Sequence, residues 1–280
     1  MQDKCWVLRF VFLIIALVLP ISCAPSEEPV QEVMQPLTPA EPEKPQVGDW
    51  VLIPAGEFIM GSNNTIVDQP ALNTPEHTVE LPDYEIMVYE VTNGQWIRFM
   101  TEGEYEPEGN WRDLYSIGRE DVPVSNLTFD DATAYCEVAG GRLPSEAEWE
   151  KAARGTEGLK YPWGDSWDPA NTNCNEMGYN NIIDVGSIEG DKSPFGVYDM
   201  MGNVTEWTSE RLRPYEGSRA RGDNMFRQPY IAVRGGSYAM RGASMSTYTR
   251  AGYFAKSQYG IGFRCARDVE VEEGSEGQSQ

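Results

Sequence analysis

Histidine and basic residues are scarce in this sequence, and their scarcity excludes several functions. The chain of 280 residues has one histidine, His77, and we find neither a catalytic serine motif nor a phosphate-binding glycine loop. The chain therefore lacks the groups on which zinc-dependent and acid–base hydrolases depend. His77 is predicted to be structural or exposed. With 22 basic and 44 acidic residues the net charge is −22, which excludes nucleic acid as a partner because binding it requires a basic face.

Long stretches of regular hydrophobic periodicity are also scarce, and there is no internal repeat. Three short helices are predicted, each beginning after a capping residue: Thr92, Thr128 and Ser145. Gln95 and Glu148 lie three residues after the first and third caps and complete capping boxes. Two apolar stretches, 51–53 and 58–60, flank a Pro-Ala-Gly turn and predict a hairpin. We therefore expect an α+β domain with much irregular structure.

The N-terminus has the order of a secretory signal. Lys4 and Arg9 precede an apolar run at 10–19, and Ser22 stands directly before Cys23. A cysteine at this point resembles the bacterial lipoprotein signal, although Pro20 stands where that signal usually has Leu. We expect residues 1–22 to be removed and Cys23 to be lipidated; the alternative is an ordinary signal peptide with a chance cysteine. Lipidation would anchor the protein in the bacterial cell envelope, at the outer membrane or the cell surface.

Two further segments are predicted to be unstructured. Residues 23–47 are rich in proline and glutamate, which is typical of a semi-stiff tether. Residues 268–280 are acidic and end in Gly, Ser and Gln, which indicates a disordered tail. The folded domain is therefore expected at 48–267.

Short phrases along the domain carry a family resemblance. In order they are Ile53–Phe58, Glu90–Asn93, Pro123–Ser125, Gly141–Glu150, Ala152–Gly155, Tyr161–Asp165, Gly196–Asn203, Glu206–Thr208, Arg234–Ser237 and Gly262–Arg264. Together they resemble the formylglycine-generating-enzyme, or sulfatase-modifying-factor, domain over residues 50–267. The resemblance implies an α+β, C-type-lectin-like fold with few regular elements, small antiparallel sheets and two or three helices.

The catalytic residues of that family are missing. The enzymes it resembles oxidise a substrate cysteine with oxygen, using two cysteines that bind copper(I) shortly after the Gly-Gly-Ser turn. Met240 and Met245 occupy the matching positions here. A thioether can coordinate copper(I) but cannot be deprotonated to the thiolate that this chemistry needs. We therefore predict that the protein is not an enzyme of this type and takes no copper cofactor.

The resemblance also implies a disulfide between Cys136 and Cys265, which match the paired cysteines of the family. Two buried free thiols are the alternative. Cys174 has no such counterpart and is expected to be a packing residue or a free thiol.

A calcium site is the third implication. Asp199, Gly202, Val204 and Glu206 match a calcium loop of the family, with two side chains and two main-chain carbonyls as ligands. Calcium favours such hard oxygens on a flexible turn, and the alternative is a turn held by side-chain hydrogen bonds. A second family site matches Asn171 and Thr172, but Met177 stands where it has an aspartate.

The segment 237–259 is dense in tyrosine, arginine and small polar residues, which is typical of binding loops. The candidate ligand contacts are Tyr238, Arg241, Ser244, Ser246, Tyr248, Arg250, Tyr253 and Phe254. The alternative is that about half of them are core residues. This segment resembles the diversified region of variable proteins of retroelements, among them a treponemal lipoprotein.

We therefore expect a surface-displayed lipoprotein that binds a protein or glycan ligand on a non-catalytic scaffold. An oxidative enzyme and a structural envelope lipoprotein are the alternatives.

Overall fold

The computed structural model describes residues 44–63 and 72–269. The predicted signal peptide, Cys23, most of the tether and nearly all of the tail lie outside the described residues. The described part forms one compact unit that starts at Lys44. Lys44 and Asp268, which were assigned to the tether and the tail, both contact the domain: the Lys44 ammonium donates to the Gly186 carbonyl (2.7 Å) and Asp268 pairs with Arg142.

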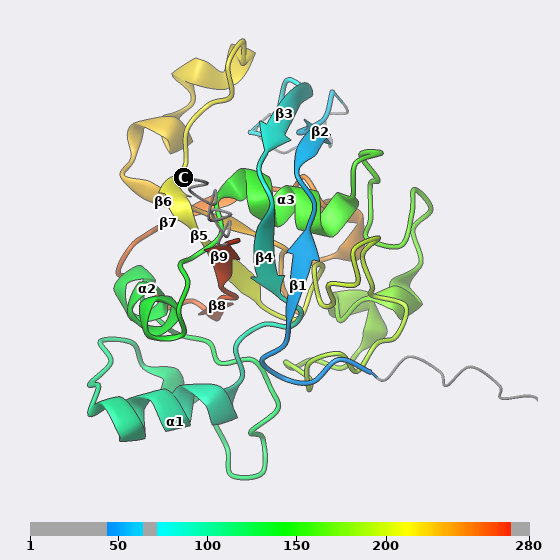
Figure 1. Cartoon of the computed structure of the whole chain (residues 1–280). Helices are drawn as coiled ribbons and strands as arrows, with labels where there is room; N and C mark the ends of the chain where they lie inside the picture. Colours follow the sequence, from blue (N-terminus) through cyan, green and yellow to red (C-terminus); the bar gives the residue numbers. More distant parts are fainter. Residues whose placement is uncertain (1–43, 64–71, 270–280) are drawn as a thin grey trace, which may run out of the picture. The chain divides into compact units, whose positions relative to one another are not determined.

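The described residues contain three α-helices, nine strands and six short 3-10 helices; the α-helices and strands are labelled in Figure 1. The strands are β1 (Trp50–Ile53), β2 (Gly56–Met60), β3 (His77–Leu81), β4 (Tyr84–Met87), β5 (Thr205–Arg211), β6 (Tyr230–Arg234), β7 (Ala251–Phe254), β8 (Ile261–Gly262) and β9 (Ala266–Asp268). The helices are α1 (Asn93–Gly103), α2 (Phe129–Val138) and α3 (Glu146–Arg154).

The strands form three small sheets. Their orders are β1-β4-β9, β2-β3 and β7-β6-β5-β8, and every pairing is antiparallel except β5 with β8. Long irregular segments join them (Figure 1). The predicted α+β, C-type-lectin-like class with small sheets is therefore confirmed.

The predicted hairpin between β1 and β2 is wrong. β1 pairs with β4, and β2 pairs with β3. Proline at residue 54 in one arm, and again at residue 82 in the other, cannot donate to a ladder, so both arms bend at the same level and pass from one sheet to the next. The Ala55 amide holds this bend by donating to Asp83 Oδ1 (2.6 Å).

All three helices begin where the capping residues predict. Thr92, Thr128 and Ser145 each accept from the backbone amide three residues on, and each helix has a complete capping box. Gly155 ends α3, as the sequence indicates. None of the helices described is long and apolar enough to span a bilayer.

A disulfide joins the C-terminal end of the domain to α2. Cys136 and Cys265 are bonded, with their Cα atoms 5.5 Å apart, which confirms the pairing that the family resemblance implied. Both cysteines lie in the core cluster that also contains Trp96, Trp207 and Phe263. The bridge therefore ties the residue just before β9 to a helix residue 129 positions earlier, in the apolar core.

Candidate functional site

Met240 and Met245 face the glycine turn that follows β6. Gly235 and Gly236 have φ of +87° and +76°, which favours glycine. A Cβ on Gly236 would lie 2.5 Å from Met245 Sδ and 3.4 Å from Met240 Sδ, so both thioethers pack on the same point. Met245 is fully buried. The two positions that would hold reactive cysteines therefore hold packed thioethers.

Cys174 lies in the same cluster but has no second thiol to work with. It packs with Met201 and Met245 and is the only free cysteine among residues 44–63 and 72–269. Burial raises the pKa of its thiol, which donates to Glu176 Oε2 (3.2 Å). A buried thiol with a raised pKa is a poor nucleophile.

An aromatic wall borders this cluster. Tyr161, Trp163 and Trp167 have ring centroids 5.3–6.0 Å apart. The main chain between the two methionines runs directly over one ring, because a Cβ on Gly242 would lie 1.9 Å from Trp167 Cζ2. Glu176 accepts from the Gly242 amide (2.8 Å) and holds the contact. The three aromatic rings therefore form a packed wall beside the two methionines.

The candidate ligand contacts divide by burial. Arg241 and Phe254 are exposed, and Tyr238, Ser244 and Tyr253 are half-buried. Ser246, Tyr248 and Arg250 are buried, which corrects their prediction as ligand contacts. These three precede β7, whose pairing with β6 draws the chain under the surface. The alternative of a mixed segment is the one that the burial supports.

Arg250 is part of a buried ionic network. Its Nε and Nη2 donate to the two oxygens of Glu146 (2.6 Å each), and Nη1 donates to the Leu72 carbonyl (2.7 Å). The guanidinium also lies 4.1 Å from the Tyr215 ring centroid. Although burial raises it, the charges of Arg250 and Arg234 hold the pKa of Glu146 below its ordinary value. Arg250 therefore supports the fold.

The accessible candidates lie at two ends of a ribbon. In the β6–β7 pairing, Tyr230 is opposite Phe254, while Val233, next to the glycine turn, is opposite Ala251. Phe254 is thus at the far end of the ribbon from Gly236. It lines an open pocket of about 490 Å³ with Asn110, Asp113, Asn126, Lys256, Ser257, Gln258 and Tyr259. Phe254 and Tyr259 are 47% and 80% exposed, which is high for aromatic side chains.

The predicted calcium loop lies over a buried acidic cluster. Asp199, Gly202 and Asn203 have positive φ, so the loop turns sharply. Asp199 Oδ2 accepts from the Gly186 amide (2.6 Å). Glu206 is engaged more fully, since its oxygens accept from Arg264 (2.8 Å each) and from the Trp149 indole (2.8 Å).

Four buried carboxyl groups lie around Arg264 in this cluster, and the charge of Lys44 also acts on Asp199. Glu90 and Asp191 join Asp199 and Glu206 around Arg264. Burial, and then the charge of Asp199, raise the pKa values of Glu90 and Asp191 well above their ordinary range. Burial likewise raises the pKa of Asp199 to about 6. Asp191 Oδ1 has no hydrogen-bond partner among the described residues.

Buried carboxyl groups with raised pKa values fit a hard cation, because its charge would stabilise their ionised forms. Within the described residues, no three acidic, histidine or cysteine side chains converge closely enough to hold a metal ion by themselves. A calcium ion would therefore depend on the main-chain carbonyls of Gly202 and Val204, with Asp199 as the carboxylate that is less engaged than Glu206. The second family site remains a prediction.

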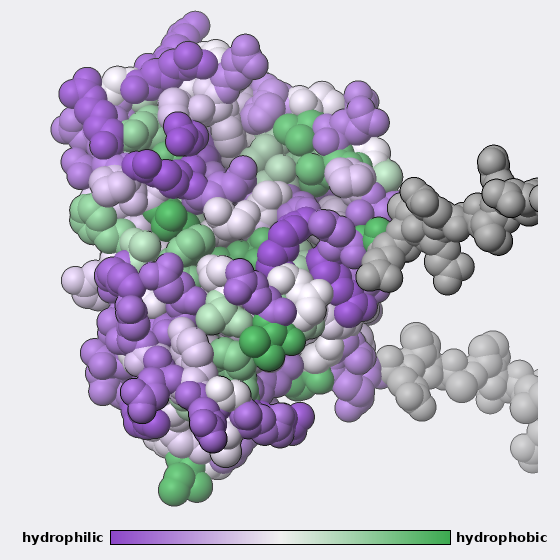
Figure 2. Space-filling view, turned by 60° about the vertical axis from the view of Figure 1, so that its left-hand side comes forward, coloured by the Kyte–Doolittle hydropathy of each residue, from purple (hydrophilic) through white to green (hydrophobic). Residues whose placement is uncertain are grey.

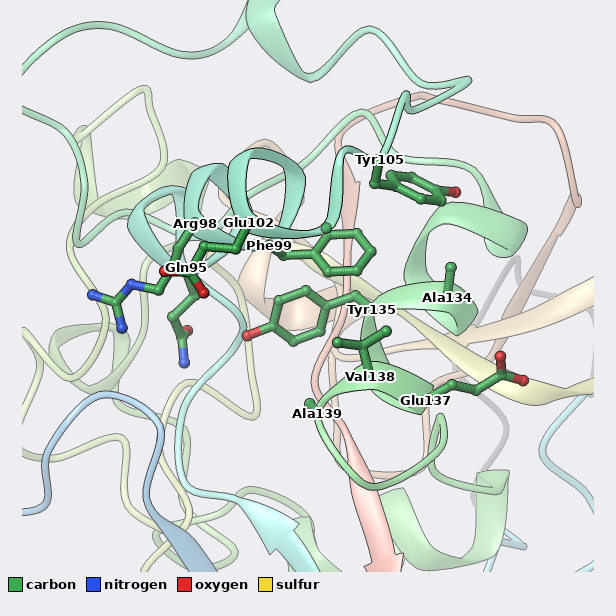
Figure 3. Close-up of a pocket in the computed structure, with 11 residues that line it drawn as sticks. Gln95, Arg98, Phe99, Glu102, Tyr105, Ala134, Tyr135, Glu137, Val138 and Ala139 are labelled. Carbon is green, nitrogen blue, oxygen red and sulfur yellow. The ribbon is translucent and has the colours of Figure 1, made fainter.

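A further pocket, between α1 and α2, was not anticipated from the sequence (Figure 3). It measures about 500 Å³ and is lined by Phe99, Tyr105 and Tyr135 with charged residues at its rim. Predicting this pocket would require knowing which faces of α1 and α2 lie against each other, and a single sequence does not give that.

Comparisons with known proteins agree with this architecture. Residues 35–269 match the model of the sulfatase-modifying factor enzyme 1-like domain. The hercynine oxygenase of Mycolicibacterium smegmatis is 29% identical over 79% of this chain and 62% of its own length. The formylglycine-generating enzyme of Streptomyces coelicolor is 32% identical over 70% and 68%. The inactive C-alpha-formylglycine-generating enzyme 2 of Mus musculus is 29% identical over 59% and 69%.

Solved structures share the fold. PvdO from Pseudomonas aeruginosa has a TM-score of 0.65 at 27% identity, covering 79% of this chain and 94% of its own. Treponema denticola variable protein 1 has a TM-score of 0.63 at 21% identity, covering 82% and 99%. The second likeness concerns the fold alone.

The family includes oxygenases, formylglycine-generating enzymes and a member named inactive, so membership leaves activity open. The chain spans less than two thirds of the M. smegmatis oxygenase. Three features nevertheless agree with membership of one family: the match over most of the sequence, the three capped helices and the Cys136–Cys265 bridge. The chain belongs to the sulfatase-modifying factor enzyme 1-like domain family.

Proposed function

We propose that this protein is a non-catalytic, ligand-binding lipoprotein of the bacterial cell envelope, with its ligand contacts in the segment 237–259. The observation that carries the proposal is the packing of Met240 and Met245 against Gly236. It leaves the scaffold complete while replacing the two thiols on which copper(I) oxidation depends. Cys174, the remaining free cysteine of the described part, has no thiol partner.

The relatives named as oxygenases make oxygen chemistry the second candidate. A facial-triad iron site of the kind that non-haem oxygenases use needs two imidazoles. This chain has one histidine, His77, at the start of β3. Its Nδ1 lies 3.0 Å from the Pro75 carbonyl, and its ring packs on Tyr215. The chain's own residues therefore favour binding over oxidation.

Ligand binding is supported by what the segment exposes. Arg241 extends from the surface near the glycine turn, and Phe254 and Tyr259 flank the open pocket at the other end of the ribbon. Exposed aromatics beside amide and hydroxyl groups suit a protein or glycan ligand, because they offer apolar area and hydrogen bonds together. Genetic diversification of the segment by a retroelement would have to spare the buried Arg250.

Two proposals complete this function. Calcium would stabilise the loop at Asp199 by neutralising the acidic cluster, and it would act structurally. Cys23 would carry lipid and hold the domain at the membrane; loss of metabolic labelling by an alkyne-tagged palmitate in Cys23→Ser tests this directly.

The catalytic question has a direct test. The purified chain is incubated with copper(I), oxygen and a cysteine-containing peptide, and oxygen uptake and peptide mass are followed. We expect no conversion, whereas the Met240→Cys, Met245→Cys double variant should gain copper(I) affinity. Turnover by the wild-type chain would refute the proposal.

The binding question uses an array of glycans and a panel of purified proteins. We expect a hit whose affinity falls about tenfold or more in Phe254→Ala, as for a central aromatic contact. Ile117→Ala is the matched control, since Ile117 is 93% exposed and outside this segment. Equal loss in both variants, or a hit unaffected by either, would contradict binding through the segment.

A further inference from the structure

We propose that the groove between α1 and α2 binds a cationic amphipathic helix of a partner protein. The groove contains no residue of the segment 237–259, so this site is independent of the ligand contacts proposed above. Its walls are Phe99 and Tyr105 on one side and Tyr135 and Val138 on the other (Figure 3).

The groove is preformed. Phe99 lies 4.8 Å from Tyr105 and 5.3 Å from Tyr135 between ring centroids, and all three pack around the fully buried Trp96. Asp131, at the start of α2, accepts from the Tyr105 hydroxyl (3.0 Å) and from the amides of Glu108 and Gly109. The disulfide at Cys136 fixes α2 to the core. A partner would therefore meet a rigid surface with little ordering cost.

The groove presents apolar area that nothing in the described chain covers. Val138 is 74% exposed at the end of α2, beside the small side chains of Ala134 and Ala139. Figure 2 turns this side of the molecule forward and shows apolar patches set among hydrophilic residues. A volume of about 500 Å³ accommodates several inserted side chains.

Both walls are helices, and this decides the form of the partner. The backbone groups of α1 and α2 are satisfied within each helix, so an extended segment would find no strand edge to pair with. A helix carries its own backbone hydrogen bonds and needs only apolar side chains at i, i+3, i+4 and i+7. The geometry therefore favours a helix laid in the groove.

Charge decides the rest of its chemistry. The rim carries Glu102 and Glu137 against one cation, Arg98, and none of the three has an ion pair among the described residues. Arg98 and Glu137 extend to opposite sides of the groove (Figure 3). With a net charge of −22 on the whole chain, long-range attraction also favours a basic partner.

The test uses two peptides of leucine and lysine with the same composition, each about 18 residues or five helical turns long. One has leucine at helical spacing, and the other is scrambled. Binding to the purified full-length chain is followed by fluorescence anisotropy. We expect the amphipathic peptide to bind at least about tenfold more tightly than the scrambled one, since only it presents a continuous apolar face.

Two matched pairs of variants locate the binding. Val138→Lys should weaken it about tenfold or more, whereas Ile117→Lys, at another exposed aliphatic position, should not. Both side chains are exposed, so neither change threatens folding.

Glu137→Gln should weaken binding, and its affinity should fall less steeply with added salt than that of the wild type. Glu216→Gln, at another exposed glutamate, is the control. Equal binding of the two peptides, or equal effects of Val138→Lys and Ile117→Lys, would overturn the proposal. Either result would mean attraction to the acidic surface as a whole.

Discussion

Replacing Arg250 by alanine should destabilise the domain by about 3 kcal/mol, the lower end of the usual cost of breaking a buried ion pair from one side, because Glu146 keeps Arg234 as a partner. The substitution removes both hydrogen bonds to Glu146 and leaves the Leu72 carbonyl without its donor. It also removes the cation that lies over Tyr215. Urea unfolding followed by tryptophan fluorescence gives the free energy of unfolding, and an unchanged slope would show that the folded state is otherwise the same.

The loss should depend on pH in a defined direction. The lowered pKa of Glu146 means that its ionised form stabilises the wild-type fold above the unfolded pKa, and that this contribution is lost as the pH falls through the folded pKa. The difference between wild type and Arg250→Ala should therefore be largest near neutral pH and shrink in acid, where Glu146 is protonated in both.

Two further variants sharpen the result. Arg250→Lys keeps the charge but loses the two-pronged contact, so it should lose an intermediate amount. Arg241→Ala, at an exposed arginine of the same segment, should stay within about 0.5 kcal/mol of wild type. A cost below about 1 kcal/mol for Arg250→Ala, matching Arg241→Ala, would refute the structural role and return Arg250 to the ligand contacts.

Three other predictions concern the calcium loop, the disulfide and the glycine that lies against Trp167. Calcium at 100 times its Kd should raise the free energy of unfolding by about 2.7 kcal/mol, and Asp199→Asn should abolish that gain in calorimetry with and without a chelator; equal melting in calcium and chelator would contradict the site. Replacing Cys136 and Cys265 by serine should cost roughly 4–5 kcal/mol because the bridge closes a loop of more than 100 residues, measured by denaturation with and without reductant, and an unchanged midpoint would argue against the pairing. Gly242→Ala should cost about 1–3 kcal/mol by pushing the new methyl into the neighbouring indole, whereas Gly222→Ala, with nothing within 4 Å of its Cβ, should be near neutral in the same thermal melts.

Local chemistry made much of the fold predictable. Thr92 and Ser145 start helices because their hydroxyls satisfy amides that the helix leaves unpaired, and that requirement is visible in the sequence. The partner of β1 was not visible, because two apolar stretches around a turn look the same whether they pair with each other or with strands farther along. Pairing of β1 with β4 depends on residues more than 30 positions apart, which no local pattern encodes.

The site was predictable to a similar degree. The substitution of cysteine by Met240 and Met245 is a property of the sequence, and their packing on Gly236 adds only its geometry. Which tyrosines and arginines of the C-terminal segment are exposed was not predictable, because Arg241 and Arg250 are the same residue type in similar surroundings. The difference arises from Glu146, a residue more than 100 positions away, which draws Arg250 inward.

The position of β9 also sets the order in which this domain can fold. The sheet β1-β4-β9 is complete only when Ala266–Asp268 pairs with β4. The Met87 amide donates to the Cys265 carbonyl and has no such acceptor before that. The first strands of the domain therefore remain without one edge partner until nearly the whole chain has been synthesised. Such distant pairing makes folding slow and leaves apolar strands exposed meanwhile. A domain of this design completes its first sheet only after β9 has been synthesised.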